Sequence, residues 1–232
     1  MNLKNFFTCS GNDCFLNNYF ADNFKKGIVN HVSYKNLSLE QRPEVIDVFT
    51  SLILTNNPST IIEIGTFAGG LTLILRDILD ILKLEHCQIY TYDVSNPMWL
   101  LDQIKNNNIK NINVNVTNLF DQSYLKLLDE TKDAEIKSLI QSSGRTILLC
   151  DGGCKKCEFN ILSQYLKPDD IIMAHDYAPN SDYFEQNMRN KIWNWHEIQD
   201  SDIIDSCRKY NLEPYMKDEA LSVAWACFKK IS

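Results

Sequence analysis

Short runs of β-branched and aliphatic residues alternate with helical patterns along most of this chain, and this alternation limits the folds open to it. Strands are predicted at 60–65, 88–93, 112–116, 146–151 and 170–176. Helical spacing of apolar residues predicts helices at 39–54, 71–82, 98–106, 122–141 and 155–166. Repeated strand–helix units favour a parallel sheet with helices on both faces.

The C-terminal part departs from that alternation. A helical stretch is expected over 183–210, and two strands at 212–216 and 222–228 follow with only a few residues between them. So short a connection requires an antiparallel pair. We therefore predict a doubly wound, Rossmann-like α/β fold whose seven-stranded sheet is mostly parallel and carries a C-terminal antiparallel hairpin. Residues 38–232 form its domain, and residues 1–37 are expected to be an extension that acts as a lid or as a contact in a homo-oligomer.

Composition excludes several classes of protein. Of the 232 residues, 44% are hydrophobic and 23% are charged, as in ordinary globular proteins. The net charge of -7 argues against nucleic acid as a partner. No apolar run reaches the ~20 residues that a membrane-spanning helix needs. The N-terminus shows no signal-peptide pattern, so we expect a cytoplasmic protein whose eight cysteines are reduced thiols.

The sharpest motif is the glycine-containing loop after the first predicted strand of the sheet. It spans residues 63–70 with the sequence EIGTFAGG. Gly65 permits a tight turn, Gly69 allows backbone to approach a ligand, and the following helix start offers free N–H groups to an anion. Asp93 ends the next strand, where a carboxylate can hold both hydroxyls of a ribose. The alternative is a structural turn flanked by two solvated acids.

Together these features resemble the class I S-adenosylmethionine-dependent methyltransferases over residues 39 to 230. In that family the glycine loop faces the methionine part of the cofactor and the second-strand acid binds the ribose. The loop after the third strand flanks the adenine, a place that Asn118 or Asp121 takes here. The implied cofactor-binding residues are Glu63, Gly65, Thr66, Gly69, Asp93, Asn118 and Asp151. The four-residue spacing of Gly65 and Gly69 differs from the GxGxxG pattern of nicotinamide dehydrogenases.

Polar residues after the fourth and fifth strands narrow the resemblance. Asp151 follows the fourth strand, and His175 and Asp176 follow the fifth. This is similar to metal-dependent O-methyltransferases of the catechol type, and more so to the sugar and macrolide O-methyltransferases of the cephalosporin hydroxylase-like and macrocin O-methyltransferase-like group. The resemblance implies that these three residues bind Mg²⁺ or Mn²⁺. Because a histidine replaces the usual carboxylate, a softer ion, a catalytic role for His175 and a hydrogen-bonded network without metal all stay open.

The general base is left open between two residues. His175 has a suitable intrinsic pKa. Lys155 would serve only if burial or a neighbouring cation lowered its pKa. Catechol-type enzymes place a lysine three residues after the fourth-strand acid, whereas this chain has Cys154 there and lysines at the next two positions. The candidate catalytic residues are His175, Asp151 and Lys155.

Two further patterns have alternative interpretations. Cys154 and Cys157 fit a redox pair or half of a zinc site. For Trp193 and Trp195 we expect one ring to pack and the other to be partly exposed, or both to form an aromatic wall for a sugar ring.

The sequence thus predicts an enzyme that transfers a methyl group from S-adenosylmethionine to a hydroxyl of a sugar or other small molecule, with divalent-cation assistance. The alternatives are a non-catalytic S-adenosylmethionine-binding module and a nicotinamide-dependent oxidoreductase.

Overall fold

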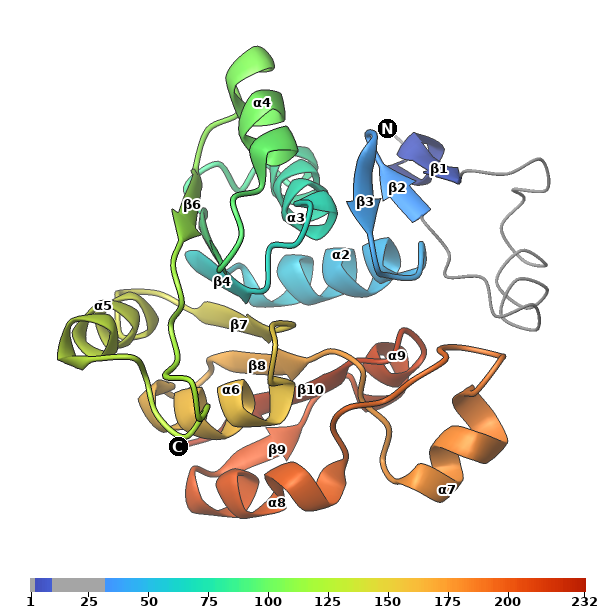
Figure 1. The fold of residues 1–232 in the computed structure, drawn as a ribbon, viewed down its shortest axis with the longest axis vertical. Helices are drawn as coiled ribbons and strands as arrows, with labels where there is room; N and C mark the ends of the chain where they lie inside the picture. Colours follow the sequence, from blue (N-terminus) through green and yellow to red (C-terminus); the bar gives the residue numbers. More distant parts are fainter. Residues whose placement is uncertain (1–2, 10–31) are drawn as a thin grey trace.

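The structure, a computed structural model, describes residues 3–9 and 32–232 of the chain. Its larger sheet has seven strands in the order β6-β5-β4-β7-β8-β10-β9 (Figure 1). These strands are β4 (Thr60–Ile64), β5 (Gln88–Asp93), β6 (Ile112–Val116), β7 (Thr146–Cys150), β8 (Ile171–Ala174), β9 (Leu212–Pro214) and β10 (Ala226–Lys230). The first five are parallel, whereas β10 is antiparallel to both β8 and β9. This confirms the predicted sheet with its C-terminal hairpin.

The helices cover both faces of this sheet. They are α2 (Val45–Asn56), α3 (Gly70–Ile81), α4 (Met98–Asn106), α5 (Glu130–Ile140), α6 (Lys155–Leu162), α7 (Ser181–Tyr183), α8 (Asp200–Lys209) and α9 (Lys217–Leu221). The strand order advances one way from β4 to β6 and the other way from β7 to β8. Right-handed crossovers therefore place α3 and α4 on one face and α5 and α6 on the other. Short turns complete the set: η1 (Leu3–Phe6), η2 (Ser163–Tyr165) and a π-helical turn, η3 (Phe184–Met188).

Two predicted helices are only partly formed. The helix expected over 122–141 begins at 130, where the Asp129 side chain accepts the N–H of Lys132 as a cap. The helix expected over 183–210 is interrupted, because residues 189–199 form an irregular segment between η3 and α8. In that segment the indole of Trp193 is buried and donates to Asp176. The helical spacing of the sequence fails here because the contact of Trp193 with Asp176 interrupts the helix, and the local pattern does not indicate this contact.

A small antiparallel sheet precedes the main one. It contains β1 (Phe7–Cys9), β2 (Val32–Tyr34) and β3 (Leu37–Leu39), and lies beside α2 and α3 (Figure 1). Tyr34 and Leu37 are buried in the main core, so the boundary predicted between residues 37 and 38 falls within a strand. Residues 1–2 and 10–31 of the predicted extension lie outside the described residues, and its role as a lid or oligomer contact stays a prediction.

The centre of the sheet forms the core of the molecule. Every residue of β4, β7 and β8 is buried, as expected for parallel strands covered on both faces. The strand order reverses between β4 and β7, and ligands of such sheets bind beyond the carboxyl ends of the strands at that point. Within the described part of the chain, no helix has the length and apolar character needed to cross a membrane.

Candidate active site

Two adjoining cavities open where the sequence predicts a site, at the carboxyl ends of the central strands. The larger has a volume of about 280 Å³, and the smaller about 110 Å³. Both are lined by Gly65, Asp93, Gly152 and Gly153, so they lie side by side. Of the other predicted residues, Thr66, Asp151, Lys155, His175 and Asp176 line the larger cavity and Asn118 lines the smaller one. The topology thus brings most of the predicted site residues together.

The glycine loop differs in one detail from the prediction. Gly65 has a φ of 94°, and a Cβ there would lie 2.2 Å from the backbone oxygen of Asp151, so only glycine fits. Gly69 also has a positive φ, but the side chain of Leu100 occupies the space beside it and Gly69 lines neither cavity. Of these two neighbouring glycines, Gly70 is the one that lines the larger cavity. Gly69 therefore shapes the helix start and does not face the cavity.

Glu63 lies beneath this loop instead of facing the cavity. Its side chain is fully buried, and Oε2 accepts hydrogen bonds of 2.6 Å from the hydroxyls of both Thr72 and Thr91. The Thr91 hydroxyl is also 2.5 Å from that of Thr66. Burial raises the pKa of Glu63 to about 7. Glu63 therefore stabilises the loop from below and does not take the predicted place against the cofactor.

Asp93 fixes the same loop from the cavity side. Its Oδ2 accepts the backbone N–H of Phe67 at 2.8 Å, and its Oδ1 accepts that of Ser95 at 2.7 Å. Phe67 has a φ of 50°, a strained conformation for a bulky residue that is typical of ligand sites. Asp93 lines both cavities, and its role in binding a ribose stays a prediction. Asn118, at the smaller cavity, accepts the N–H of Phe120.

On the β7–β8 side, Asp151, His175 and Asp176 come together as predicted. One potential ligand atom from each lies within 4.8 Å of the others. Nδ1 of His175 is 3.1 Å from Oδ1 of Asp151 and 3.4 Å from Oδ1 of Asp176. The imidazole lies between the indoles of Trp193 and Trp225, with ring centroids 5.0 and 4.9 Å away. Its Nε2 is buried and has no hydrogen-bond partner among the described residues.

Gln41 completes this cluster and was not identified from the sequence. Its Nε2 donates to Oδ2 of Asp151 at 2.8 Å, and its Oε1 accepts the indole N–H of Trp225 at 2.9 Å. These two bonds fix the orientation of the amide. The partners are 110 and 184 residues away along the chain, so no local pattern indicates them.

The Lys155 ammonium lies at the centre of the charges on this side. Its Nζ is 3.0 Å from Oδ2 of Asp176, 3.0 Å from Oε2 of Glu197 and 3.9 Å from Oδ1 of Asp151. It also donates to the backbone oxygen of Gly152 at 3.2 Å. Burial by itself lowers the pKa of Lys155, but Asp176 and Asp151 raise it well above its usual range. Lys155 therefore stays charged and does not fit the predicted role of general base.

The imidazole and its neighbouring carboxylate stabilise each other's charged forms. Burial lowers the pKa of His175, but the carboxylates of Asp151 and Asp176 outweigh this and raise it. Burial raises the pKa of Asp176, but His175 and Lys155 outweigh this and lower it. For Asp151 the burial effect dominates, and its pKa is raised. The cluster is thus a network of paired charges in which the pKa of Asp151 is raised and that of Asp176 is lowered.

The oxygen atoms of this cluster are largely engaged by donors of the chain itself. Asp151 accepts from Gln41 and pairs with His175. Asp176 accepts from the indole N–H of Trp193 at 2.5 Å and from the Lys155 ammonium. Mg²⁺ requires near-octahedral oxygen ligands at about 2.1 Å, and here a fixed positive charge already contacts one of them. As arranged, the oxygen and nitrogen atoms of Asp151, His175 and Asp176 therefore do not fit a divalent cation. They fit the alternative of a hydrogen-bonded network without metal.

Cys154 and Cys157 form a disulfide at the start of α6, with a Cα–Cα distance of 5.3 Å. This corrects the expectation that all eight cysteines are reduced. It agrees with the redox-pair interpretation, because sulfur atoms in a disulfide are not thiolate ligands for zinc. Among the described residues, the free cysteines are the buried Cys87, Cys150, Cys207 and Cys227.

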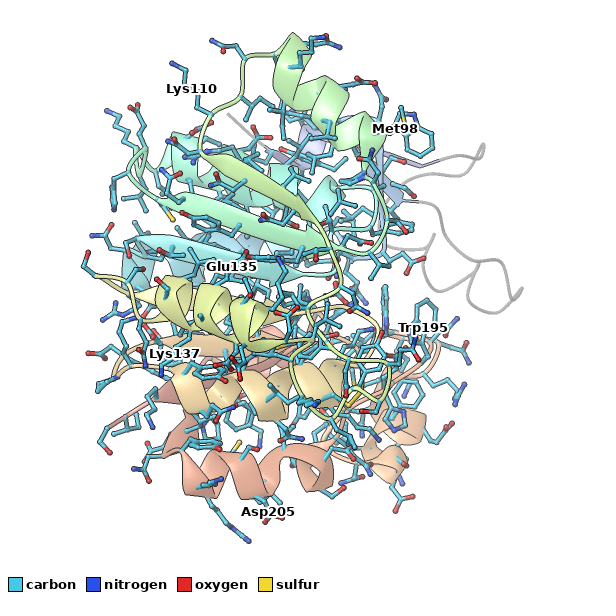
Figure 2. The ribbon with its side chains drawn as sticks, turned by 60° about the vertical axis from the view of Figure 1, so that its left-hand side comes forward. Met98, Lys110, Glu135, Lys137, Trp195 and Asp205 are labelled. Atoms are coloured by element: carbon cyan, nitrogen blue, oxygen red, sulfur yellow. A yellow bond between two sulfur atoms is a disulfide. The ribbon has the colours of Figure 1, made fainter. Side chains whose placement is uncertain are left out.

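Of the two neighbouring tryptophans, one lines the larger cavity and the other lies beside the first. Trp193 lines the cavity and is 4% exposed, whereas Trp195 is 36% exposed. This confirms that one ring packs and the other is partly exposed. Because they lie in an irregular segment, their rings come within 4.9 Å of each other, which a helix would not allow. Figure 2 shows Trp195 at the same side of the molecule as Met98 at the start of α4.

Comparison with known proteins identifies the fold. No protein-family model and no curated protein sequence matches the chain. Among solved structures, CmcI with Mg-SAM superposes with a TM-score of 0.59 at 19% identity, covering 86% of this chain and 76% of that one. CmcI with SAH gives 0.55 at 15% identity, covering 86% and 82%. An O-methyltransferase family protein from Burkholderia thailandensis gives 0.51 at 10% identity, covering 81% and 55%. The chain therefore has the fold of the class I methyltransferases, as the sequence resemblance predicts.

Proposed function

We propose that this protein transfers a methyl group from S-adenosylmethionine to a hydroxyl group of a small molecule. The observation that carries the proposal is the larger cavity at the carboxyl edge of the sheet. Gly65, Thr66 and Asp93 line it on the cofactor side, and Asp151 and Lys155 line it on the opposite side. The methyltransferase fold of the chain supports the choice of cofactor.

Methyl transfer requires positioning and removal of one proton. When bound, S-adenosylmethionine supplies a methyl group on a positively charged sulfur. The acceptor oxygen forms the new O–C bond, the C–S bond breaks, and its electron pair stays on sulfur. The proton of the acceptor hydroxyl must leave the oxygen. The chain must therefore hold the acceptor oxygen in line with the methyl group and provide a base.

Asp151 is the base that the geometry favours. Its carboxylate lines the cavity, and its pKa is raised. His175 lies behind it, with Nδ1 facing Asp151 and Nε2 enclosed. We propose that Asp151 accepts the proton and that His175 holds the carboxylate and stabilises its charge. This assigns His175 a positioning role in place of the predicted role of base.

A sugar is the acceptor class that we propose. Sugar rings stack on indoles, and Trp195 offers a partly exposed ring beside Trp193 at the cavity. Substituting Trp195→Ala should raise KM for a sugar acceptor and leave KM for the cofactor unchanged. Trp99→Phe, at an indole that is 71% exposed on α4, is the matched control. Equal effects of Trp195→Ala on all acceptors would remove the support for a sugar.

Divalent-cation assistance is the one part of the sequence prediction that the donor set does not favour. The oxygen atoms of Asp151 and Asp176 already accept hydrogen bonds from other residues of the chain. The proposed reaction therefore does not involve a metal ion. A cytoplasmic location and a homo-oligomer stay predictions.

The test is turnover with methyl-labelled S-adenosylmethionine on panels of sugars and phenols. An enzyme should label one class of acceptor, and Asp151→Asn should abolish labelling while S-adenosylhomocysteine still binds. Asp93→Ala should instead weaken cofactor binding. Tight cofactor binding with no labelling of any acceptor would favour the non-catalytic binding module. Binding of nicotinamide cofactors in its place would favour the oxidoreductase.

A further inference from the structure

The cluster beside the acceptor cavity contains an internal cation. The Lys155 side chain begins in the first turn of α6 and is 8% exposed. Its Nζ lies near oxygen atoms of four residues from three segments: Asp176 after β8, Glu197 in the irregular segment, and Gly152 and, at 3.9 Å, Asp151 after β7. Oxygen atoms therefore surround the ammonium group on several sides, as they would surround a bound metal ion.

This ammonium competes directly with a divalent cation. An ion bound to Oδ2 of Asp176 at about 2.1 Å would lie within about 5 Å of Nζ, because Nζ is 3.0 Å from the same oxygen. Two positive centres at that separation repel each other strongly in a site shielded from water. The remaining oxygen atoms of the two aspartates are held by Gln41 and Trp193, both buried. The chain thus supplies both the positive charge and the hydrogen bonds that such an ion would replace.

We propose that Lys155 takes the place of the divalent cation, so that the protein binds no metal at Asp151, His175 and Asp176 and is active without one. As a positioning residue, Lys155 stabilises the negative charge that develops on the acceptor oxygen next to Asp151. The catalytic half of this inference rests on the proposed function, whereas the exclusion of metal does not.

The test is a titration with Mn²⁺. Binding is measured by calorimetry and by the electron paramagnetic resonance signal of the free ion. The variants are Lys155→Ala, Lys155→Arg and, as the matched control, Lys156→Ala, which changes an exposed lysine on the same helix turn. Wild type, Lys155→Arg and Lys156→Ala should not bind Mn²⁺ at the cluster. Lys155→Ala leaves the buried carboxylate of Asp176 and the half-buried one of Asp151 without their ammonium, and should gain at least about tenfold in Mn²⁺ affinity. Asp151→Asn in the Lys155→Ala background should abolish that gain.

Two results would overturn the proposal. One is Mn²⁺ binding to wild type that is lost in Asp151→Asn. The other is a folded Lys155→Ala protein, shown by its thermal unfolding, that gains no affinity for Mn²⁺. If Lys155→Ala does not fold, the comparison of wild type with Asp151→Asn still decides the first point.

Activity provides an independent readout. Wild type should retain methyl transfer in excess EDTA, Lys155→Arg should retain part of it, and Lys155→Ala should lose it by about 100-fold, the range of one electrostatic contact to a developing oxyanion. Turnover that requires added Mg²⁺ or Mn²⁺ would contradict the proposal. Failure to bind S-adenosylhomocysteine would instead contradict the proposed function and leave the Mn²⁺ titration as the deciding measurement for the metal.

Discussion

Two buried carboxylates at the same edge of the sheet are held in opposite ways. Glu63, on the cofactor side, accepts hydrogen bonds from threonine hydroxyls, and burial raises its pKa to about 7. Asp176, on the acceptor side, faces the imidazole of His175 and the ammonium of Lys155, which lower its pKa despite burial. The buried carboxyl group on the cofactor side is therefore held by uncharged hydroxyl groups, and the one on the acceptor side by charged groups.

The two sides also differ in how far apart their parts lie in the chain. The hydrogen bonds among Glu63, Thr66, Thr72, Thr91 and Asp93 join residues no more than 28 positions apart. On the acceptor side, Gln41 binds residues 110 and 184 positions away. A contiguous strand–loop–helix unit therefore forms the cofactor side, whereas the acceptor side requires the complete fold. Four substitutions test this contrast.

The largest effect is expected at the junction of the two sides. Gly65→Ala places a Cβ 2.2 Å from the backbone oxygen of Asp151 in a left-handed conformation. We expect a loss of about 5 kcal/mol or no folded protein. In Gly153→Ala the new Cβ meets a tyrosine hydroxyl, so that control should lose less than about 1 kcal/mol. Chemical denaturation measures both, and similar losses would show that the two loops are not pressed together as described.

On the acceptor side, Asp176→Asn should be nearly as damaging. It leaves the buried ammonium of Lys155 without its best-shielded partner, at an expected cost of about 3 kcal/mol. Glu197→Gln changes a partner of the same ammonium whose side chain is 48% exposed, and should cost less than about 1 kcal/mol. Urea unfolding at neutral pH compares the two. A larger loss for Glu197→Gln would mean that burial does not decide the strength of these pairs.

On the cofactor side, we expect the stability of the protein to depend on pH. The pKa of Glu63 is raised from 4.5 to about 7, so the folded protein holds a proton that the unfolded chain releases. Stability should therefore fall as pH rises from about 4.5 to about 7 and level off above that range. Glu63→Gln should remove this contribution and stabilise the protein by about 2 kcal/mol at pH 8. Glu158, whose pKa is also raised to about 7 by burial, contributes a second fall that Glu63→Gln leaves in place.

That prediction is checked by thermal unfolding of wild type and Glu63→Gln between pH 5 and pH 8. Curves that run parallel across this range would show that Glu63 is ionised in the folded protein and would contradict its raised pKa.

The smallest effect is expected from a single indole N–H. Trp225→Phe keeps an aromatic ring beside His175 but removes the donor to Oε1 of Gln41. A buried amide oxygen without a partner should cost about 1 kcal/mol. Trp99→Phe, at an exposed indole, should change stability by less than about 0.5 kcal/mol. A cost for Trp225→Phe no larger than this control would mean that Gln41 is not held as described.

The same contrast explains what the sequence predicted. The order and type of the strands follow from local runs of β-branched residues, and β5, α4 and β6 match their predicted bounds. The positions of Gly65, Asp93, Asp151, His175 and Asp176 follow from where each strand ends. The local sequence pattern therefore predicts the residues of the cofactor side and the acidic residues of the acceptor side.

The rest depends on contacts between distant segments. Gln41, Trp193 and Trp225 join the site because separate elements pack together, and their spacing in the sequence does not show it. The sequence predicts a base role for Lys155 only if its pKa is lowered, and the carboxylates that the fold places around Lys155 raise its pKa instead. Similarly, Gly69 and Gly70 have the same local signal, and only the packing of Leu100 shows which one faces the cavity.

Calorimetric titration of the folded protein with S-adenosylhomocysteine in excess EDTA tests the central claim most directly. Our account predicts micromolar binding that is weakened in Asp93→Ala and unchanged when Mg²⁺ replaces EDTA. No binding under either condition, by protein whose thermal unfolding shows it to be folded, would contradict it.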